Sequence, residues 1–271
     1  MSRAPIDVRR YGETGDPVVV LHGGPGAPGY MAPIARTICD SYQVHEPLQR
    51  LADGTPLTMQ SHVDDLAEVA PERAHIVGAS FGAMLGLSYA SLHPERVKSL
   101  VLIGCGTYDL ASRAEYKRRM NERLGPEGVA LKAELDERFA ASEDEAERAD
   151  LFAAMGELSI FAQSVDPIEH ESDVLAFDEV GHGETWSDTM RLQSEGIEPQ
   201  RFSAITCNVL MVHGEQDPHP GQAIFQTLAR HVLHIRYSQY ANCGHEPWLE
   251  RHAQAPFYSA LRAWLFDRGA D

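Results

Sequence analysis

A serine lies between two glycines in Gly78-Ala79-Ser80-Phe81-Gly82, which matches the pattern G-x-S-x-G. An apolar run over residues 74–77 precedes the pattern and predicts a strand, and a run rich in small residues over 81–92 predicts a helix. A serine at such a turn is exposed for nucleophilic attack, and only small residues fit two positions on either side of it. The pattern alone is weak, so the flanking strand and helix support the prediction that Ser80 is a nucleophile.

A serine hydroxyl is a poor nucleophile until a base takes its proton, so a histidine and an acid are required. His245 follows the last predicted strand and precedes the last predicted helix. Asp217 follows a predicted strand over residues 208–212, and its carboxylate could orient the imidazole and stabilise its charged form. Glu215 is the alternative acid. We favour Asp217 because an Asp-Pro pair shortly after His-Gly fits the loop better.

The glycine-rich segment His22-Gly23-Gly24-Pro25-Gly26 follows a predicted strand over residues 18–21. Acyl transfer needs two N–H groups aimed at the developing oxyanion. The N–H of Phe81 is one candidate, and the N–H of Gly24, or of Gly23, is the other, because glycine lets the backbone approach the acyl group closely. The segment lacks the Lys-Ser/Thr of a phosphate loop, and G-x-G-x-x-G is absent, so we expect no cofactor.

Short apolar runs and helical patterns alternate along much of the chain, which predicts βαβ units and an open, doubly wound, mostly parallel sheet. The predicted strands are 6–11, 18–21, 42–46, 74–77, 97–103, 208–212 and 232–237. The predicted helices between and after them are 30–39, 59–70, 81–92, 222–230 and 255–267.

The alternation stops between residues 109 and 206, where charged helical stretches such as 112–124 and 128–141 replace strands. We therefore predict a core domain formed by residues 1–108 and 207–271, with a helical cap (lid) domain over 109–206 inserted between strands. The charge separates in the same way, because residues 109–201 hold 23 acidic and 10 basic residues, a net of −13 out of −17. This acidity indicates either a solvated helical surface or an entrance that attracts cationic or free-amine substrates.

Composition excludes several other classes of protein. A net charge of −17 disfavours nucleic acid and anionic membrane surfaces as partners. No apolar run approaches the length of a membrane span, and no secretory signal is visible, so a cytoplasmic protein is expected. The four cysteines lie far apart without a CxxC motif, and the histidines lack ligand spacing, so we expect reduced thiols and no metal site.

Four motifs resemble those of the α/β-hydrolase superfamily in order and spacing over essentially the whole chain: residues 22–26, 78–82, 213–217 and 244–247. The chain order Ser80, Asp217, His245 is that of the superfamily's triads. His-Gly-Gly-Pro-Gly is similar to the proline iminopeptidase branch, whose members cleave N-terminal residues from small peptides and use acidic cap residues to hold the free amine. Epoxide hydrolases and haloalkane dehalogenases of this fold have aspartate where this chain has Ser80.

The chain departs from the proline iminopeptidase branch at three places. Phe81 stands where the branch usually has tryptophan. In having phenylalanine here, the chain is similar to esterases and carbon–carbon bond hydrolases of the superfamily. Residues 46–54 do not contain the branch's D-Q-R-G-x-G-x-S segment. Only residues 6–11 can form a strand before 18–21, where the family usually has two, so we predict a sheet without its first edge strand.

These observations predict a cofactor-independent serine hydrolase that cleaves a small acyl substrate, an ester or the amide bond of a short peptide, through an acyl-enzyme. A proline iminopeptidase-like aminopeptidase and a carbon–carbon bond hydrolase are alternatives with the same catalytic residues. A non-catalytic ligand-binding protein on the same scaffold is the least favoured alternative. His22, Glu184 and Trp186 are candidate substrate contacts, and Trp186 could equally belong to the core of the cap.

Overall fold

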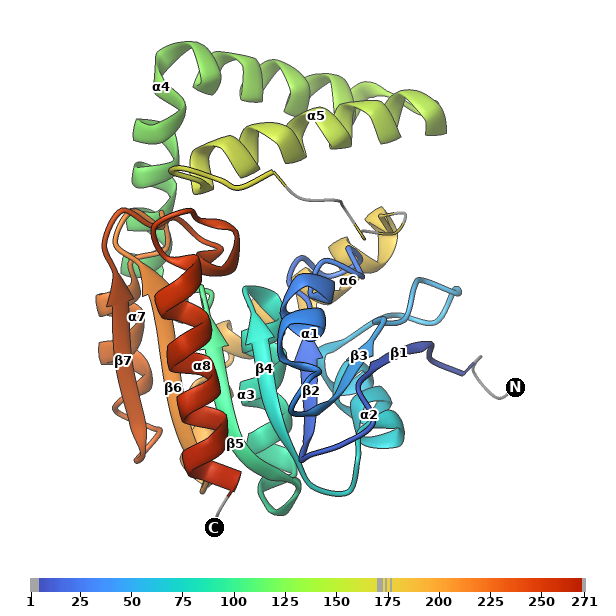
Figure 1. Cartoon of the computed structure of the whole chain (residues 1–271). Coiled ribbons are helices and arrows are strands. Elements are labelled where there is room, and N and C mark those ends of the chain that lie inside the picture. Colours follow the sequence, from blue (N-terminus) through green and yellow to red (C-terminus); the bar gives the residue numbers. More distant parts are fainter. Residues whose placement is uncertain (1–4, 170–172, 174, 176, 270–271) are drawn as a thin grey trace.

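A seven-stranded sheet with the order β1-β3-β2-β4-β5-β6-β7 runs through the centre of the molecule (Figure 1). The computed structural model describes residues 5–269 except 170–172, 174 and 176. The termini of the predicted core domain and five residues of the predicted cap therefore lie outside the described residues. The strands are β1 (Val8–Tyr11), β2 (Pro17–Leu21), β3 (Gln43–Pro47), β4 (Ala74–Ala79), β5 (Val97–Ile103), β6 (Asn208–Gly214) and β7 (Ile235–Tyr240).

The sheet is parallel except at one edge, where β1 pairs antiparallel with β3. In the described residues β1 is the one strand that precedes β2, as the short N-terminal segment predicts. Parallel strands bring their carboxyl ends to the same edge of the sheet, so the loops that follow β2, β4, β6 and β7 meet there.

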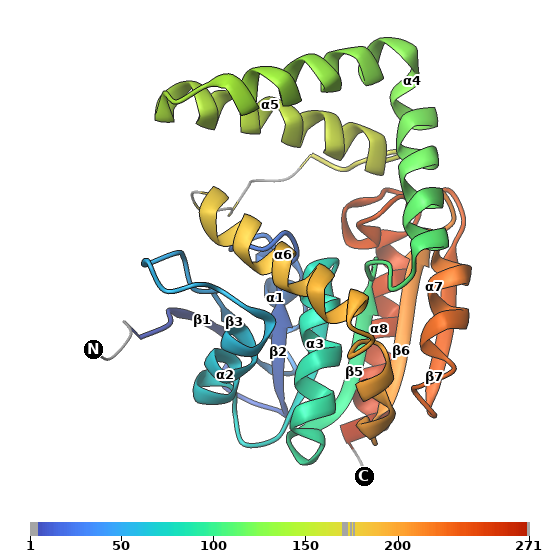
Figure 2. The ribbon, with the colours of Figure 1, turned by 180° about the vertical axis from the view of Figure 1, so that it is seen from behind.

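Helices cover both faces of the sheet, which explains why its strands are apolar runs rather than alternating patterns. In β2, Val18 and Val20 pack in the same core as helices α1 and α8, whereas Val19 and Leu21 face α2, α3 and α7 (Figures 1 and 2). The helices are α1 (Ala32–Ile38), α2 (Met59–Val69), α3 (Phe81–Leu92), α7 (Gly221–Leu228) and α8 (Gln254–Gly269), with 3-10 turns η1 (Pro94–Arg96) and η3 (Pro247–Leu249).

The last strand begins later than the sequence predicts. β7 spans Ile235–Tyr240 rather than 232–237, and Ile235 is the residue that pairs with Val209 of β6. Val232 is buried, but its N–H donates to the carbonyl of Leu228 at the end of α7, so it closes the helix and does not extend the sheet. The apolar run over residues 232–237 thus belongs partly to the end of α7 and partly to β7, and its composition does not reveal this division.

Three helices interrupt the alternation and lie above the carboxyl edge of the sheet: α4 (Leu110–Ala141), α5 (Glu145–Gln163) and α6 (Glu179–Ser194), followed by η2 (Gln200–Ala204) (Figures 1 and 2). The predicted stretches 112–124 and 128–141 are the two arms of α4. Gly125, with φ 66° and ψ 176°, breaks the helix just before Pro126. The bend carries the second arm over the sheet, where it packs against α5.

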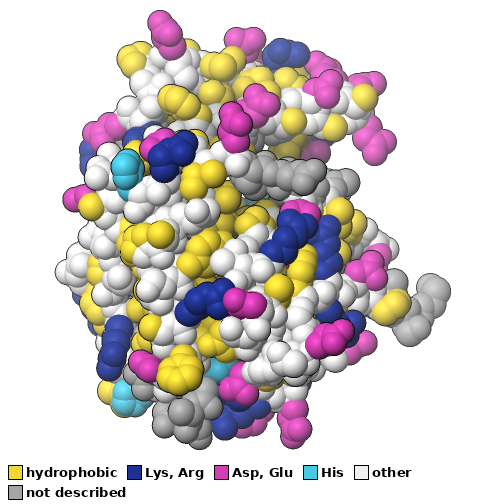
Figure 3. Space-filling model, in the orientation of Figure 1, with side chains coloured by type: hydrophobic (Ala, Val, Ile, Leu, Met, Phe, Trp, Pro, Cys, Tyr) yellow, Lys and Arg dark blue, Asp and Glu magenta, His cyan; other side chains and the backbone are white. Residues whose placement is uncertain are grey.

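Acidic side chains gather along α4 and α5, at the top of the molecule in Figure 3. Several pair with a basic residue one helical turn away, as Glu115 does with Arg118 and Arg119. Much of the negative charge is thus on a solvated helical surface. None of the described helices is both long and apolar enough to span a membrane.

Candidate active site

Ser80 occupies the turn between β4 and α3 in a strained backbone conformation, with φ 52° and ψ −117°. Its N–H donates to the carbonyl of Ile103, 2.8 Å away on the neighbouring strand, which holds the turn at the sheet edge. A Cβ on Gly82 would lie 2.2 Å from the carbonyl oxygen of Leu21, and one on Gly78 would lie 2.2 Å from that of Gly82. The two glycines of the motif are therefore required by backbone packing, and the strain presents the serine side chain.

His245 and Asp217 meet at the same edge, on the loops after β7 and β6. His245 Nδ1 lies 2.9 Å from Asp217 Oδ2, Asp217 is fully buried, and His245 is 7% exposed. Glu215, the alternative acid, is exposed to solvent. With Nδ1–H donating to Asp217, the other ring nitrogen of His245 is available to accept a proton. The Ser80 hydroxyl makes no hydrogen bond to another described residue, and such contacts commonly tighten only when substrate binds.

A second histidine contacts the same carboxylate. Asp217 Oδ1 accepts from the backbone N–H of His219 at 2.9 Å and from its Nδ1–H at 3.0 Å. The ring of His219 stacks on that of His245 with centroids 4.7 Å apart, and the ring of Tyr116 of α4, tilted by 30°, lies 4.3 Å from that of His219. His213 Nδ1 lies 3.2 Å from Asp217 Oδ2 without hydrogen-bond geometry. Asp217 is thus fixed on both of its oxygens.

These contacts determine the charge states in the cluster. Burial opposes the charged form of His245, but the Asp217 carboxylate outweighs it and raises the pKa of His245 above 6.5. Burial also opposes ionisation of Asp217, yet His245, His219 and His213 together hold its pKa well below 3.8. Burial lowers the pKa of His219. Asp217 is therefore ionised, and His219 donates to it as a neutral imidazole.

The ligand atoms of Asp217, His219 and His245 all lie within 4.8 Å of one another, a spacing at which a metal ion could be held. Both imidazole Nδ1 atoms, however, make hydrogen bonds to the carboxylate. A metal bound through these two Nδ1 atoms would have to replace both protons, so the Nδ1 geometry fits hydrogen bonding to Asp217 better than metal ligation.

The loop after β2 places a backbone donor beside the serine. Gly24 has a φ of +47°, and a Cβ on Gly23 would lie 2.7 Å from the Cβ of Ser80. The Gly23 N–H donates to Tyr30 Oη at 2.8 Å and is therefore already used. The N–H groups of Gly24 and Phe81 have no acceptor among the described residues, so they are the pair available to an oxyanion.

His22 lies beneath this loop rather than in contact with solvent. It is fully buried, its Nδ1 lies 2.9 Å from the carbonyl of Gly23, and its Nε2 accepts from the Gln49 N–H at 3.2 Å. Burial lowers the pKa of His22 to about 4, so the ring is neutral. Both nitrogens are occupied, and this geometry fits support of the glycine loop instead of the substrate contact that the sequence predicts.

The loop that bears His245 is hydrogen-bonded to the end of α5. The His245 N–H donates to the carbonyl of Gln163 at 2.8 Å. The carboxylate of Glu250, 2% exposed, accepts from the N–H groups of Gly244 at 3.1 Å, Val165 at 2.8 Å and Asp166 at 2.7 Å. Glu250 therefore joins the residue before His245 to the two residues that follow the C-cap of α5.

The sequence model described as the alpha/beta hydrolase family matches residues 18–257, a range that includes Ser80, Asp217 and His245. The chain belongs to the alpha/beta hydrolase family. Its mostly parallel sheet with one antiparallel edge pair agrees with the fold that the four sequence motifs predict.

Curated relatives of this chain have several activities. The chain is 37% identical over 109 residues to a probable proline iminopeptidase of Streptomyces coelicolor, with 34% of each chain covered. It is 32% identical over 111 residues to a 2-hydroxy-6-oxononadienedioate/2-hydroxy-6-oxononatrienedioate hydrolase of Pseudomonas putida, covering 35% of this chain and 38% of the relative. It is 30% identical over 109 residues to a cis-3-alkyl-4-alkyloxetan-2-one decarboxylase of Shewanella oneidensis, covering 35% and 34%. The matches thus span about a third of the length of these relatives.

Solved structures match along nearly the whole chain. A proline iminopeptidase of Mycobacterium smegmatis aligns with a TM-score of 0.61 and 23% identity, covering 97% of this chain and 96% of the other. An esterase of Thermogutta terrifontis aligns with a TM-score of 0.65 and 20% identity, covering 97% and 94%. These likenesses establish the fold.

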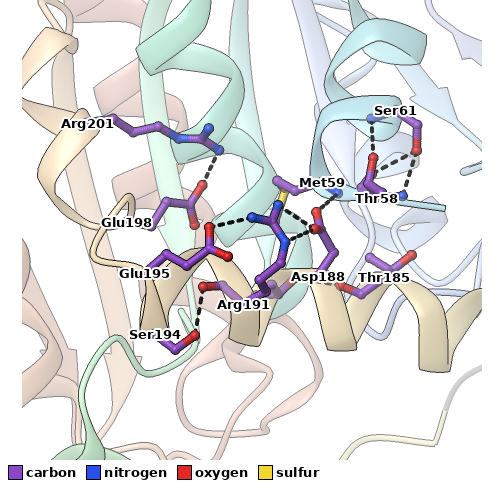
Figure 4. A network of polar contacts seen from close by, with 11 residues as sticks. Thr58, Met59, Ser61, Thr185, Asp188, Arg191, Ser194, Glu195, Glu198 and Arg201 are labelled. Carbon is purple, nitrogen blue, oxygen red and sulfur yellow. Dashed lines mark hydrogen bonds and ion pairs between the residues drawn. The ribbon is translucent and has the colours of Figure 1, made fainter. Parts of the chain in front are cut away.

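Helix α6 is attached to the segment that begins α2. Glu184, predicted to contact substrate, accepts from the backbone N–H of Leu57 at 2.9 Å, and Asp188 accepts from that of Met59 at 2.9 Å. Figure 4 shows Asp188 between Met59 and Arg191. Glu184 thus has an anchoring contact that the sequence did not predict.

Trp186 remains 39% exposed, with its ring edge-on to that of Phe81 at 6.4 Å, so it lies next to the residue that follows the serine.

A cavity of about 1110 Å³ opens beneath α5. Side chains of α5, the beginning of α6, the loop after β2 and residues 246–250 line it. Tyr30, whose hydroxyl accepts from Gly23, and Glu246, which follows His245, belong to its wall. The cavity therefore adjoins both the glycine loop and the histidine loop.

Proposed function

We propose that this chain is a cofactor-independent serine hydrolase that cleaves a small acyl substrate, an ester or an amide, through an acyl-enzyme. The buried hydrogen bond between His245 and Asp217 is the observation that chiefly supports the proposal, because an imidazole held by an ionised carboxylate is a base suited to a serine. Ser80 lies at the same sheet edge in the strained turn that such nucleophiles occupy.

The proposed reaction has two steps. Ser80 Oγ attacks the acyl carbon while His245 Nε2 takes the hydroxyl proton, and the N–H groups of Gly24 and Phe81 hold the oxyanion. The intermediate then expels the alcohol or amine, which receives the proton from His245. Water next attacks the acyl-enzyme, giving its proton to His245, and Ser80 recovers a proton as the acid leaves. Asp217 stabilises the imidazolium in both steps.

We also propose that residues 109–206 act as a cap over Ser80, with the core formed by 1–108 and 207–271. The position of α4, α5 and α6 above the carboxyl edge of the sheet supports this division (Figure 2). A cap excludes water from the acyl-enzyme until hydrolysis and encloses the substrate, so it would determine specificity.

Replacing the proposed nucleophile tests the mechanism. Ser80→Ala should abolish turnover of p-nitrophenyl butyrate and labelling by a fluorophosphonate probe, with the melting temperature close to that of the wild type. Ser203→Ala, at an exposed serine of η2, is the matched control and should retain both. Turnover or labelling by Ser80→Ala at the wild-type rate would refute the assignment.

An aminopeptidase is a second candidate, favoured by the negative charge near the base. Glu246 follows His245 and lines the cavity, and its charge adds to burial in raising the pKa of Tyr30. A carboxylate there could hold a substrate's free amine. Prolyl-2-naphthylamide should then be cleaved at least tenfold faster than its N-acetyl form, and Glu246→Gln should reduce this preference. Equal cleavage of the two compounds would exclude this candidate and leave the esterase proposal intact.

A further inference from the structure

The cavity beneath α5 is larger than a short acyl group needs. Its volume of about 1110 Å³ exceeds the roughly 300–1,000 Å³ of typical small-molecule sites. An acetyl or butyryl group would leave most of it filled with water. The volume therefore calls for a substrate with a large additional group, and the chemistry of the wall indicates which kind.

One face of α5 forms the roof of the cavity. Ala149, Phe152, Ala153, Gly156 and Ile160 all line it. Residues three and four positions apart share one face of a helix, so these five form a continuous apolar stripe. The small residues at three of the positions leave the space open. These five positions thus offer apolar surface, whereas Glu145 and Arg148, at the start of α5, supply the polar lining of that helix.

Apolar side chains outside α5, among them Phe177 and Val180, also line the cavity. The ring of Phe177 stacks on that of Phe152 with centroids 3.7 Å apart. Val180 is 59% exposed and Ile160 is 65% exposed, although both line the cavity. Large apolar side chains that gather around a hollow are typical of a binding surface for an apolar ligand.

The charged groups nearest these walls are already paired. Arg148, the one guanidinium among the described lining residues, pairs with Glu179 and donates to two backbone carbonyls. Asp178 caps the first turn of α6, and Glu250 accepts from three backbone N–H groups. In the described lining, therefore, no cation is left to pair with an anionic group of a substrate.

The remaining charge of the cavity is negative. Six carboxylates and one guanidinium line its described part. Glu143 and Glu145, two of those carboxylates, are exposed to solvent. A carboxylate or phosphate placed in the cavity would lose water without gaining a partner and would face like charges. The lining of the cavity therefore disfavours anionic groups of a substrate and favours apolar ones.

We propose that this cavity holds a large, uncharged apolar part of the substrate, such as a medium-chain acyl group or a bulky aromatic acyl group. The inference rests on the proposed function, because it assigns a substrate class to the same site. The described lining includes Tyr30, which accepts from Gly23, and Glu246, which follows His245, but not Ser80, Asp217 or His245. We therefore expect the chain of an acyl group at Ser80 to extend past Tyr30 and Glu246 and beneath α5. The hydrolase would therefore prefer medium-chain neutral esters to short or anionic ones.

A chain-length series tests the inference on the wild-type protein. A methylene that leaves water completely favours binding by roughly fourfold, and partial burial gives less. The value of kcat/KM should therefore be at least tenfold higher for p-nitrophenyl octanoate than for p-nitrophenyl acetate. The mono-p-nitrophenyl ester of suberic acid, in which a carboxylate replaces the terminal methyl group of the octanoyl chain, should react at least tenfold more slowly than the octanoate. A flat chain-length profile, or equal rates for the neutral and anionic esters, would overturn the inference.

A pair of glycine variants locates the chain in the cavity. Gly156 of α5 lines the cavity, and a Cβ there would meet nothing within 4 Å, so Gly156→Leu fills open space. It should lower kcat/KM for the octanoate at least tenfold and leave the acetate within twofold. Gly183 of α6 is exposed, has equally open surroundings and lies outside the lining, so Gly183→Leu is the matched control and should change neither value.

The outcomes separate the two proposals. Loss of activity by Gly156→Leu on acetate and octanoate alike, with an unchanged melting temperature, would place the chain elsewhere and refute this inference. Failure of the wild type to hydrolyse any ester or to react with a fluorophosphonate probe would instead refute the proposed function. Both variants replace a helical glycine with a good helix former, so both are expected to fold.

Discussion

Glu250 offers the sharpest test of how the histidine loop is positioned. Its carboxylate accepts three backbone N–H groups, from Gly244, Val165 and Asp166, at 2.7 to 3.1 Å. Glu250→Gln preserves the size of the side chain but replaces one oxygen with an NH₂ group, which would face an N–H donor. At least one charge-assisted hydrogen bond is lost, and the others become neutral.

The magnitude follows from the number of bonds. A hydrogen bond to a charged group contributes about 1.5–3 kcal/mol, so the free energy of unfolding should fall by at least that amount. At roughly 2 °C per kcal/mol for a chain of this size, the melting temperature should fall by about 3–6 °C. Because a misplacement of about 1 Å can cost roughly 100-fold in rate, kcat should fall roughly 10- to 100-fold with KM within about twofold.

The assay combines thermal denaturation, kcat and KM for p-nitrophenyl butyrate, and the rate of fluorophosphonate labelling. Glu95→Gln, at an exposed glutamate of η1, is the matched control and should behave as the wild type. A Glu250→Gln variant that melts lower but keeps the wild-type kcat and labelling rate would show that Glu250 stabilises the fold without positioning His245. An unchanged melting temperature would refute the hydrogen-bonded role altogether.

Three further predictions concern the reacting cluster. His219→Phe keeps the ring stack on His245 but loses the side-chain donor to Asp217, whereas His219→Asn keeps a side-chain donor and loses the stack. The value of kcat should fall roughly tenfold in His219→Phe and less in His219→Asn. A larger fall in His219→Asn would contradict the role of the donor. Asp217 raises the pKa of His245, which must be neutral to act as base, so wild-type activity should fall as pH falls through that raised pKa. In Asp217→Asn the raising contribution is lost while burial remains, so the acid limb of the pH–rate profile should move to lower pH and kcat should fall about 10⁴-fold; an unmoved limb would exclude this pair as its origin. Gly82→Ala places a Cβ about 2.2 Å from the carbonyl oxygen of Leu21, so urea denaturation should show a loss of about 3 kcal/mol or more, and a stability within about 0.5 kcal/mol of wild type would contradict the elbow packing.

The sequence by itself determined the local features of this protein. Apolar runs ending in glycine predict the strands, and the helix over Phe81–Leu92 has the bounds that the pattern indicates. The positions of Ser80, Asp217 and His245 after predicted strands predict that the three side chains lie close together. The physical reason is that the carboxyl ends of parallel strands meet at one edge of the sheet, which brings distant loops together. The sequence also predicts the single strand that precedes β2 in the described residues.

Only the tertiary structure decided which groups surround those residues. His219 lies two residues beyond Asp217, which is a weak signal. Its ring contact with Tyr116 depends on the path of α4, and its stacking on His245 depends on the loop after β7. Glu250 carries no local signal, because its three donors come from segments about eighty residues apart.

The cavity has the same origin. The alanines and the glycine of α5 resemble ordinary helix residues in sequence, and they form a roof only because the bend at Gly125 directs α4 and α5 over the sheet. The sequence likewise does not reveal the backbone partners of His22 and Glu184, two predicted substrate contacts, because packing alone brings these partners within reach. Residues placed by the direction of the strands can thus be predicted from sequence. A cavity and the partners of buried charges cannot, because they arise from contacts between helices that are remote in the chain.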